Sequence, residues 1–210
     1  MNKEALINLW SNKEVKIAVG VFLGLFAFQL FQWTFVDYLT VFIFPLVKLA
    51  VVVVFFIYFI RSIFKAFGKN RSNITSVVLA INLASVLMFL FFPFTELSLQ
   101  SDFKLHHAAR QEVVEKIKSS ELSNNMDHNK SMIHLSLSDG RLSKGGNDIR
   151  FEGEEGNLSV MFYTFRGVID NFAAIIYKEN NIPPTNEDFN CGYLIDSLKF
   201  QDNWYWMSCT

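Results

Sequence analysis

Two cysteines, Cys191 and Cys209, carry the best-defined covalent chemistry that this sequence offers. In a compartment outside the cytoplasm, two thiols at this separation oxidise to a disulfide. Closing a loop of about 18 residues in this way stabilises a small domain by about 3 kcal/mol in the chain-entropy model. The alternative is a pair of free external thiols. We predict the disulfide, because the charge pattern of the chain places both residues outside the cytoplasm.

The histidines do not follow a metal-binding spacing. His106 and His107 are adjacent, so on a helix they point about 100° apart and do not readily share one ion. The sequence also lacks metalloprotease, nucleophile-elbow, phosphate-loop and dinucleotide-binding motifs. We therefore expect no metal and no cofactor. Enzymatic activity is the less favoured interpretation, and the residues that would carry it are His128, His134 and Asp139.

An aromatic motif, Trp204-Tyr-Trp206, lies near the end of the chain. On a β-strand the two tryptophans share one face and Tyr205 occupies the other. One interpretation makes the tryptophan face a platform for a sugar or a peptide. The other, which we favour, places the rings in the core between a sheet and a helix. Trp204 and Trp206 therefore remain a candidate binding surface.

Three apolar runs fill the first 94 residues, and each approaches the roughly 20 residues that an α-helix needs to cross a bilayer. The runs are residues 17–36, 39–60 and 76–94. The first run exceeds a signal-peptide core and lacks a small-residue cleavage pattern, so we expect it to be retained. The sequence thus predicts a multi-pass anchor of three transmembrane helices over residues 17–94, after a cytoplasmic segment of residues 1–16.

Charge orients these runs. Residues 1–94 contain eight Lys/Arg and three Asp/Glu, a net charge of +5, whereas residues 95–210 contain eleven and seventeen, a net charge of −6. Basic residues precede the first run and connect the second to the third, and such residues prefer the cytoplasmic side. They are Lys3, Lys13, Lys16, Arg61, Lys65, Lys69 and Arg71. We predict a cytoplasmic N-terminus and an external, acidic head that does not bind nucleic acid.

Polar and small residues interrupt the apolar runs. Lys48 lies near the midpoint of the second run, where a charge costs at least about 2.5–3.5 kcal/mol on insertion scales. Gln29 and Asn82 lie at a similar depth, so we predict that their amide carbonyls compensate Lys48. This layer is either a polar clasp between helices, which we favour, or a relay or ligand contact. Gly20 and Gly24 have the small-xxx-small spacing, for packing within the bundle or against a second copy.

Residues 95–210 show the pattern of a small α+β domain with one helix and an antiparallel sheet. The helix is expected from Ser101 or Asp102 to about Leu122. Alternating apolar residues between turn signals then predict five to seven strands. The strand segments are residues 133–137, 149–152, 158–165, 168–177, 193–200 and 204–208. The segment 168–177 is also compatible with a helix, but its neighbours favour a strand.

These observations favour a non-enzymatic protein of the cell envelope, whose external head binds a protein or a small ligand. The lipid bilayer is the partner that the apolar runs require. Two other classes remain open: an envelope enzyme of unknown reaction, and a small membrane effector, immunity or channel component centred on Lys48. The abundance of Phe, Asn, Ile and Lys suggests an A/T-rich genome, so we expect a bacterial inner or plasma membrane.

Overall fold

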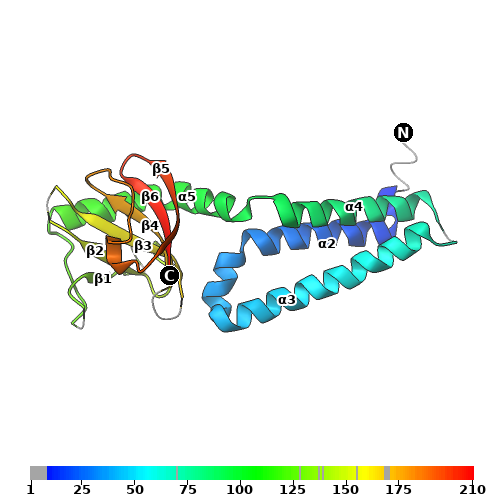
Figure 1. Ribbon diagram of the computed structural model, residues 1–210, viewed down its shortest axis with the longest axis horizontal. Helices are drawn as coiled ribbons and strands as arrows, with labels where there is room; N and C mark the ends of the chain where they lie inside the picture. The colour runs from blue at the N-terminus through cyan, green and yellow to red at the C-terminus, as the bar shows by residue number, and fades with distance from the viewer. Residues whose placement is uncertain are drawn as a thin grey trace. The chain divides into compact units, whose positions relative to one another are not determined.

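The chain folds into two compact units, Met1–Ser98 and Leu99–Thr210. The computed structural model describes residues 9–69, 71–127, 129–136, 138, 140–154, 156–167 and 171–210. The first unit is helical, and the second contains an antiparallel sheet (Figure 1).

Three helices form most of the first unit: α2 (Lys13–Leu30), α3 (Gln32–Phe67) and α4 (Asn73–Phe91). α2 and α4 lie side by side and run in the same direction (Figure 1), and Val15 and Ala18 cluster with Val78 between them. Asn12 and Ser72 cap these two helices with their side chains, which accept hydrogen bonds from first-turn N–H groups. The caps explain why both helices begin before the apolar runs do.

The boundary between the first two predicted runs is wrong in its position. The break expected at residues 37–38 occurs instead at Phe31, and a second irregularity follows at Thr40, with φ 68° and ψ 160°. Thr40 is β-branched, and such residues rarely take a positive φ, so its residue type does not predict a bend at this position. After the bend the helix continues past the predicted end, Ile60, to Phe67.

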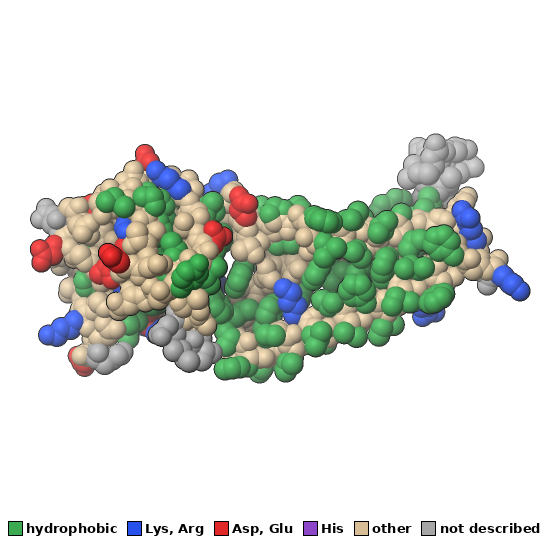
Figure 2. Space-filling view, in the orientation of Figure 1, with side chains coloured by type: hydrophobic (Ala, Val, Ile, Leu, Met, Phe, Trp, Pro, Cys, Tyr) green, Lys and Arg blue, Asp and Glu red, His purple; other side chains and the backbone are tan. Residues whose placement is uncertain are grey.

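Two of the helices, α3 and α4, are long and apolar enough to cross a membrane. Only 11% and 17% of the residues in their most apolar stretches are buried within the structure. Large apolar side chains such as Phe42, Leu46 and Phe91 are 68–76% exposed, and Figure 2 shows hydrophobic side chains over much of the visible face of this unit. The first predicted run corresponds largely to α2, which carries Lys13, Glu14 and Lys16 in its first turn. A membrane crossing by α2 stays a prediction.

The second unit is a six-stranded antiparallel sheet in the order β1-β2-β3-β4-β6-β5. This sheet confirms the antiparallel architecture predicted for the head. The strands are β1 (Met132–His134), β2 (Asp148–Glu152), β3 (Ser159–Arg166), β4 (Phe172–Lys178), β5 (Leu194–Gln201) and β6 (Trp204–Cys209). Residues 172–177 form a strand, as preferred, whereas residues 168–170 lie outside the described part of the chain.

One helix, α5 (Phe94–Lys118), packs on the sheet, and its bounds differ from the prediction. It begins directly after Pro93 instead of at Ser101 or Asp102, and it ends before Leu122. The segment before Ser101, which was not expected to be helical, contains Leu99, which is buried in the core together with Phe103. Burial of these side chains against the sheet favours helix where local composition favoured a loop.

The core under α5 is aromatic. Phe103 stacks on Phe200, with ring centroids 4.4 Å apart, and Trp204 is 1% exposed. The remaining core side chains include Val113, Val114, Val160, Phe162, Ile175 and Trp206. Within β3, β4 and β6 every second residue points toward this core, as the two-residue period of a strand requires.

A buried arginine links α5 to the loop before β2. Arg110 is 2% exposed, donates to Asp102 Oδ2 at 2.7 Å and donates to the Leu142 carbonyl at 2.9 and 3.2 Å. Burial lowers the pKa of Arg110, and the neighbouring Asp102 carboxylate opposes that effect. The loop is held further by Asn147, which donates to the carbonyls of Leu135 and Gly140.

We expect Asp102→Ala to destabilise the head more than Arg110→Met does. Removing the carboxylate leaves a buried guanidinium without its counter-charge, which costs about 3 kcal/mol, whereas the apolar replacement removes the charge itself. Denaturant unfolding followed by near-ultraviolet circular dichroism measures both. Glu112→Ala removes an exposed pair with Lys116 and should change stability by less than about 1 kcal/mol. Equal losses for all three variants would contradict this account.

Candidate functional site in the disulfide-linked loop

The loop between β4 and β5, residues 179–193, covers the face of the sheet opposite α5. Its Phe189 side chain is 1% exposed. The side chain packs among the strand residues that alternate with those under α5, namely Met161, Tyr163, Ala174, Ile176, Tyr205 and Met207. Both faces of the sheet are therefore buried, one by a helix and the other by an irregular loop.

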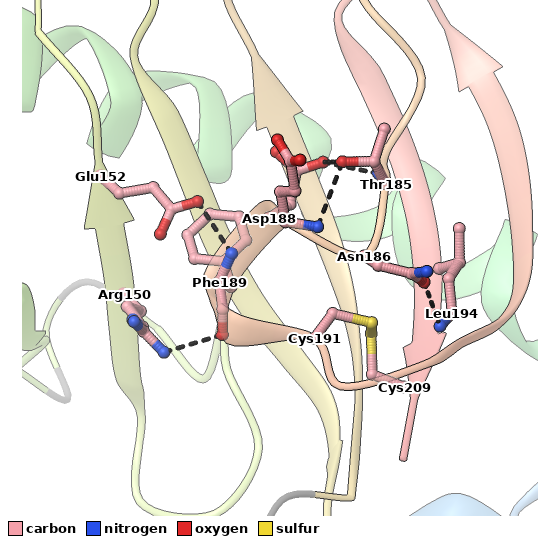
Figure 3. The surroundings of a disulfide bond; sticks show 10 residues. Arg150, Glu152, Thr185, Asn186, Asp188, Phe189, Cys191, Leu194 and Cys209 are labelled. Carbon is pink, nitrogen blue, oxygen red and sulfur yellow. Dashed lines mark hydrogen bonds between the residues drawn. A yellow bond between two sulfur atoms is a disulfide. The ribbon is translucent and has the colours of Figure 1, made fainter.

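A disulfide between Cys191 and Cys209 fastens the end of this loop to β6, with the two Cα atoms 5.5 Å apart (Figure 3). The predicted disulfide is thus confirmed. Because β6 lies between β4 and β5 in the sheet, the bond ties the loop to a central strand. The covalent link limits how far the segment beyond Cys191 can move from the sheet.

Hydrogen bonds between the Phe189 backbone and two side chains hold the loop at Phe189, where the chain takes an unusual conformation. Phe189 has φ 55° and ψ 27°, a left-handed backbone that bulky residues rarely adopt. Its N–H donates to Glu152 Oε1 at 2.8 Å, and its carbonyl accepts from Arg150 at 2.9 Å (Figure 3). Both partners come from β2, so neighbouring strand side chains stabilise the strained residue.

Ion pairs hold both ends of the loop. Lys178, the last residue of β4, donates to Asp188 at 2.5 Å, and its side chain is 6% exposed. Asp188 also accepts the Thr185 N–H at 2.6 Å. At the start of the loop, a hydrogen bond from Lys118 lowers the pKa of Glu179, and the N–H groups of Leu158 and Gly156 add to this effect.

Beyond the disulfide, the chain presents two apolar side chains to solvent, Tyr193 and Ile195, which we call the edge pair. They are 65% and 59% exposed. Their backbone is held firmly: Tyr193 and Thr210 exchange two backbone hydrogen bonds of 2.9 and 3.1 Å, and the Leu194 N–H donates to Asn186 at 2.7 Å (Figure 3). The edge pair is therefore an exposed apolar feature on an ordered backbone.

The edge pair lies at the start of an edge strand, β5, which has β6 as its neighbour in the sheet order. Register shifts interrupt the β5–β6 pairing near both ends of β5. Bulges and charged side chains such as Asp196 and Lys199 reduce uncontrolled strand addition at a sheet edge. Side-chain contacts at Tyr193 and Ile195 are thus better suited to recognition than backbone pairing along β5.

The two tryptophans of the predicted aromatic platform are buried. Trp204 and Trp206 are 1% and 8% exposed. Their indole N–H groups donate to Gln111 at 3.1 Å and to Thr164 at 3.2 Å. This burial favours the core interpretation, because neither ring offers an open face on which a sugar or peptide would stack.

Lys48 binds a different partner from those expected. Its ammonium group donates to Gln32 Oε1 at 3.1 Å, and both residues belong to α3. In a straight helix, positions 16 apart are about 24 Å from each other along the axis, beyond the reach of these side chains. The bend at Thr40 therefore brings them together, and Gln32 satisfies a charge that would otherwise be costly in an apolar environment.

The other two members of the predicted polar layer, Gln29 and Asn82, are 6% and 0% exposed. Among the described residues, the Gln29 side-chain oxygen and both Asn82 amide atoms have no hydrogen-bond partner. Their carbonyl oxygens therefore do not compensate Lys48 in this structure, where Gln32 takes that role.

Gly20 and Gly24 do not contribute to packing inside the helical unit. A Cβ atom added at either position would meet no atom within 4 Å. Close approach of helices within the same bundle is therefore not the role of this spacing. Packing against a second copy stays a prediction.

The histidines form local pairs. His134 Nδ1 lies 2.8 Å from Asp148 Oδ1, and Arg166 also contacts Asp148 at 3.2 Å. His128 and Asp139, the other residues named for a catalytic site, lie outside the described residues. Within the part of the chain that the structure describes, no three His, Cys, Asp or Glu side chains come together as a metal site.

Comparison with known proteins found no matching family model, no matching curated protein and no matching solved structure. The candidate site therefore depends on its own geometry. Sequence reasoning found the two cysteines but missed Phe189 and the edge pair. The available signal was the Pro-containing loop next to Cys191, because a loop joined covalently to a strand presents its flanking residues in a defined position.

Removing the disulfide should destabilise the head and loosen the loop. We expect Cys191→Ser together with Cys209→Ser to lower the free energy of unfolding by about 3 kcal/mol. Hydrogen exchange of residues 179–193 should rise more than that of β3 and β4, because ion pairs and Phe189 alone would then hold the loop. The matched control is the unsubstituted protein with reductant, which should behave alike. Unchanged exchange in the loop would contradict this prediction.

Proposed function

We propose that this chain is a membrane-anchored protein of the cell envelope whose external head binds another protein without catalysing a reaction. Three features support the proposal: the apolar helices, the opposite charges of the two halves of the chain, and the edge pair. The edge pair is the observation that carries the binding role.

Support for membrane anchoring comes from the exposed apolar surface of the helical unit. The core helix of a soluble protein is mostly buried, whereas the most apolar stretches of α3 and α4 are 11% and 17% buried. Apolar surface of this extent in water marks an interaction with lipid or protein. A surrounding lipid bilayer would cover this exposed apolar surface of α3 and α4 on all of its sides.

Support for an external head comes from charge. The basic residues gather at the start of α2, at the end of α3 and in the connection from α3 to α4, and residues 95–210 carry a net charge of −6. Positive-inside anchoring places the basic connections in the cytoplasm. With α2 proposed as a third span, the odd number of crossings places the head outside, in a compartment where a disulfide persists.

Support for binding comes from the way Tyr193 and Ile195 are presented. An apolar side chain on an ordered backbone loses little conformational entropy when a partner covers it, so more of the contact energy appears as affinity. Tyrosine is also enriched at protein interfaces, because its ring buries apolar area while its hydroxyl remains able to hydrogen-bond. The pair therefore has the character of a small preorganised contact centre.

The chemistry of the partner follows from the surroundings of the edge pair. Glu187 and Asp196 are exposed on the same stretch of chain, within a head of net negative charge. Charge complementarity favours a partner protein with an apolar centre and Lys or Arg around it. Such an interface should weaken as salt increases, because exposed charge pairs are screened over about 10 Å at 0.1 M ionic strength.

Topology reporters test the anchoring. A reporter fused after Thr95 should be active only if it functions outside the cytoplasm, and one inserted at Gly68 should report the cytoplasm. Resistance of the full chain to alkaline extraction from membranes provides a second measurement. A cytoplasmic signal from the head, or release of the chain at high pH, would refute the proposed localisation.

Site-specific photocrosslinking in the native cell tests the binding role. A photoreactive residue at position 193 should give a discrete crosslinked band that Ile195→Asp abolishes, because a charge at this contact is costly to desolvate. Ile195 is exposed, so the substitution should change stability by no more than about 0.5 kcal/mol. Leu105 on α5, which is 78% exposed, provides the matched control position. Equal crosslinking at both positions, or none at 193, would contradict the proposal.

A further inference from the structure

Two adjoining hollows lie in the helical unit, and they differ in chemistry. The first is a cavity of about 140 Å³ bordered by α2, α3 and α4. Its polar lining comes from Glu14, Tyr58, Arg61, Ser62, Lys65 and Thr75. The second is a more open groove of about 470 Å³ beside α3, with Ile57, Ile60 and Phe64 in its walls. Arg61 and Lys65 border both hollows.

The shared boundary carries a positive charge that the protein does not neutralise. Lys65 forms an ion pair with Glu14, which holds the ammonium group beside the polar cavity. Arg61 forms no ion pair or hydrogen bond with any residue that the structure describes. With one carboxylate against two cations, the polar cavity has a net charge of +1. The guanidinium group of Arg61 is available to an anion, and its planar donors suit the geometry of phosphate oxygens.

The position of Arg61 matches the level of lipid headgroups. After the bend at Thr40, residues 41–60 form an apolar helical stretch about 30 Å long, close to the thickness of a hydrocarbon core. Arg61 follows this stretch directly. A ligand with a charged end at Arg61 therefore has its apolar part alongside Ile57 and Ile60, at the depth of acyl chains.

The combination selects an amphipathic ligand. Inorganic phosphate would use the cations and leave the apolar groove empty, whereas a fatty acyl chain alone would leave the polar cavity empty. The cavity far exceeds the roughly 10–15 Å³ needed to admit one water, so it has room for a small headgroup alcohol. A phospholipid uses both hollows and the charge between them.

We propose that these two hollows form one binding site for an anionic phospholipid, with the phosphate at Arg61 and Lys65 and an acyl chain along Ile57 and Ile60. The inference rests on the membrane anchoring proposed above, and it adds a specific lipid to the general bilayer. The lipid bridges α2, α3 and α4 at one end of the helical unit. Arg61 and Lys65 therefore contact one bound lipid molecule, in addition to the general attraction of basic residues to an anionic leaflet.

The test measures lipid retained by the detergent-solubilised full chain. Protein from mixed phosphatidylglycerol and phosphatidylcholine membranes is examined by native mass spectrometry. The unsubstituted chain should retain one phosphatidylglycerol, and Arg61→Gln should reduce its occupancy about tenfold, because a charge-assisted phosphate contact is lost. Arg61→Lys should restore part of it. Ile57→Ala should also reduce retention, because it removes apolar groove wall at the depth of the acyl chain.

Lys16→Gln is the matched control, because it removes one positive charge from α2 without bordering either hollow. It should retain lipid as the unsubstituted chain does. An equal loss in Lys16→Gln would show that only general charge matters and would overturn the site. Equal retention of phosphatidylglycerol and phosphatidylcholine, or displacement of the lipid by millimolar inorganic phosphate, would also overturn it.

Alkaline extraction of the same preparations separates this inference from the proposed function. If the unsubstituted chain is released from membranes, the membrane anchoring itself fails. If it stays in the membrane while Arg61→Gln retains lipid unchanged, only the lipid site fails. Circular dichroism of each variant confirms that the helices are intact, so a loss of lipid reports on the site.

Discussion

The sheet of the head has two apolar faces, and every feature of the candidate site depends on how the second face is covered. α5 covers the first face with a regular stripe of side chains. The second face is covered by a loop, which has no repeating hydrogen bonds to position it. A loop over an apolar face must bury its own backbone groups, and each of them needs a partner. The partners of Phe189 in β2 answer that requirement.

This requirement explains why so many different interactions meet in residues 179–193. The disulfide, the Lys178–Asp188 ion pair and the hydrogen bonds to Phe189 each act on a different part of the loop. None of them alone would hold an irregular segment of this length against its conformational entropy. Together they place Tyr193 and Ile195 on an ordered backbone while both side chains remain in solvent. The stability of the head and the presentation of its contact residues thus have one origin.

The helical unit follows a different logic, because its outer surface is apolar and its polar groups lie between or at the ends of its helices. The bend at Thr40 lets Gln32 bind Lys48, so a charge within an apolar helix is satisfied inside the same element. At the other end of α3, Lys65 is paired with Glu14, and Arg61 remains available. Lys48 has a partner within α3 and is therefore a structural cation, whereas Arg61 has none among the described residues and is suited to a ligand.

Local sequence patterns determined the parts of this protein that depend on period and composition. The apolar helices α3 and α4, the antiparallel sheet and strands β2, β3, β5 and β6 follow from residues close together in the chain, because hydrophobic periodicity reports which face is buried. The Cys191–Cys209 bond was also predictable, since the chain has only these two cysteines. The start of α5 was not predictable, because burial of Leu99 against the sheet outweighs the polar residues around it.

Only the tertiary structure decided the features that depend on residues distant in sequence. Pro45, about one turn after Thr40, is the local signal of a bend in α3. No local pattern indicates that Gln32 instead of Gln29 or Asn82 binds Lys48, or that Phe189 adopts a left-handed backbone. Each of these conformations is unfavourable by itself and persists because contacts from elsewhere compensate for it. The edge pair and the two adjoining hollows are likewise products of assembly, since exposure and cavity shape exist only after the elements have packed. Sequence thus determined which segments are apolar and how they repeat, and packing decided which side chains meet.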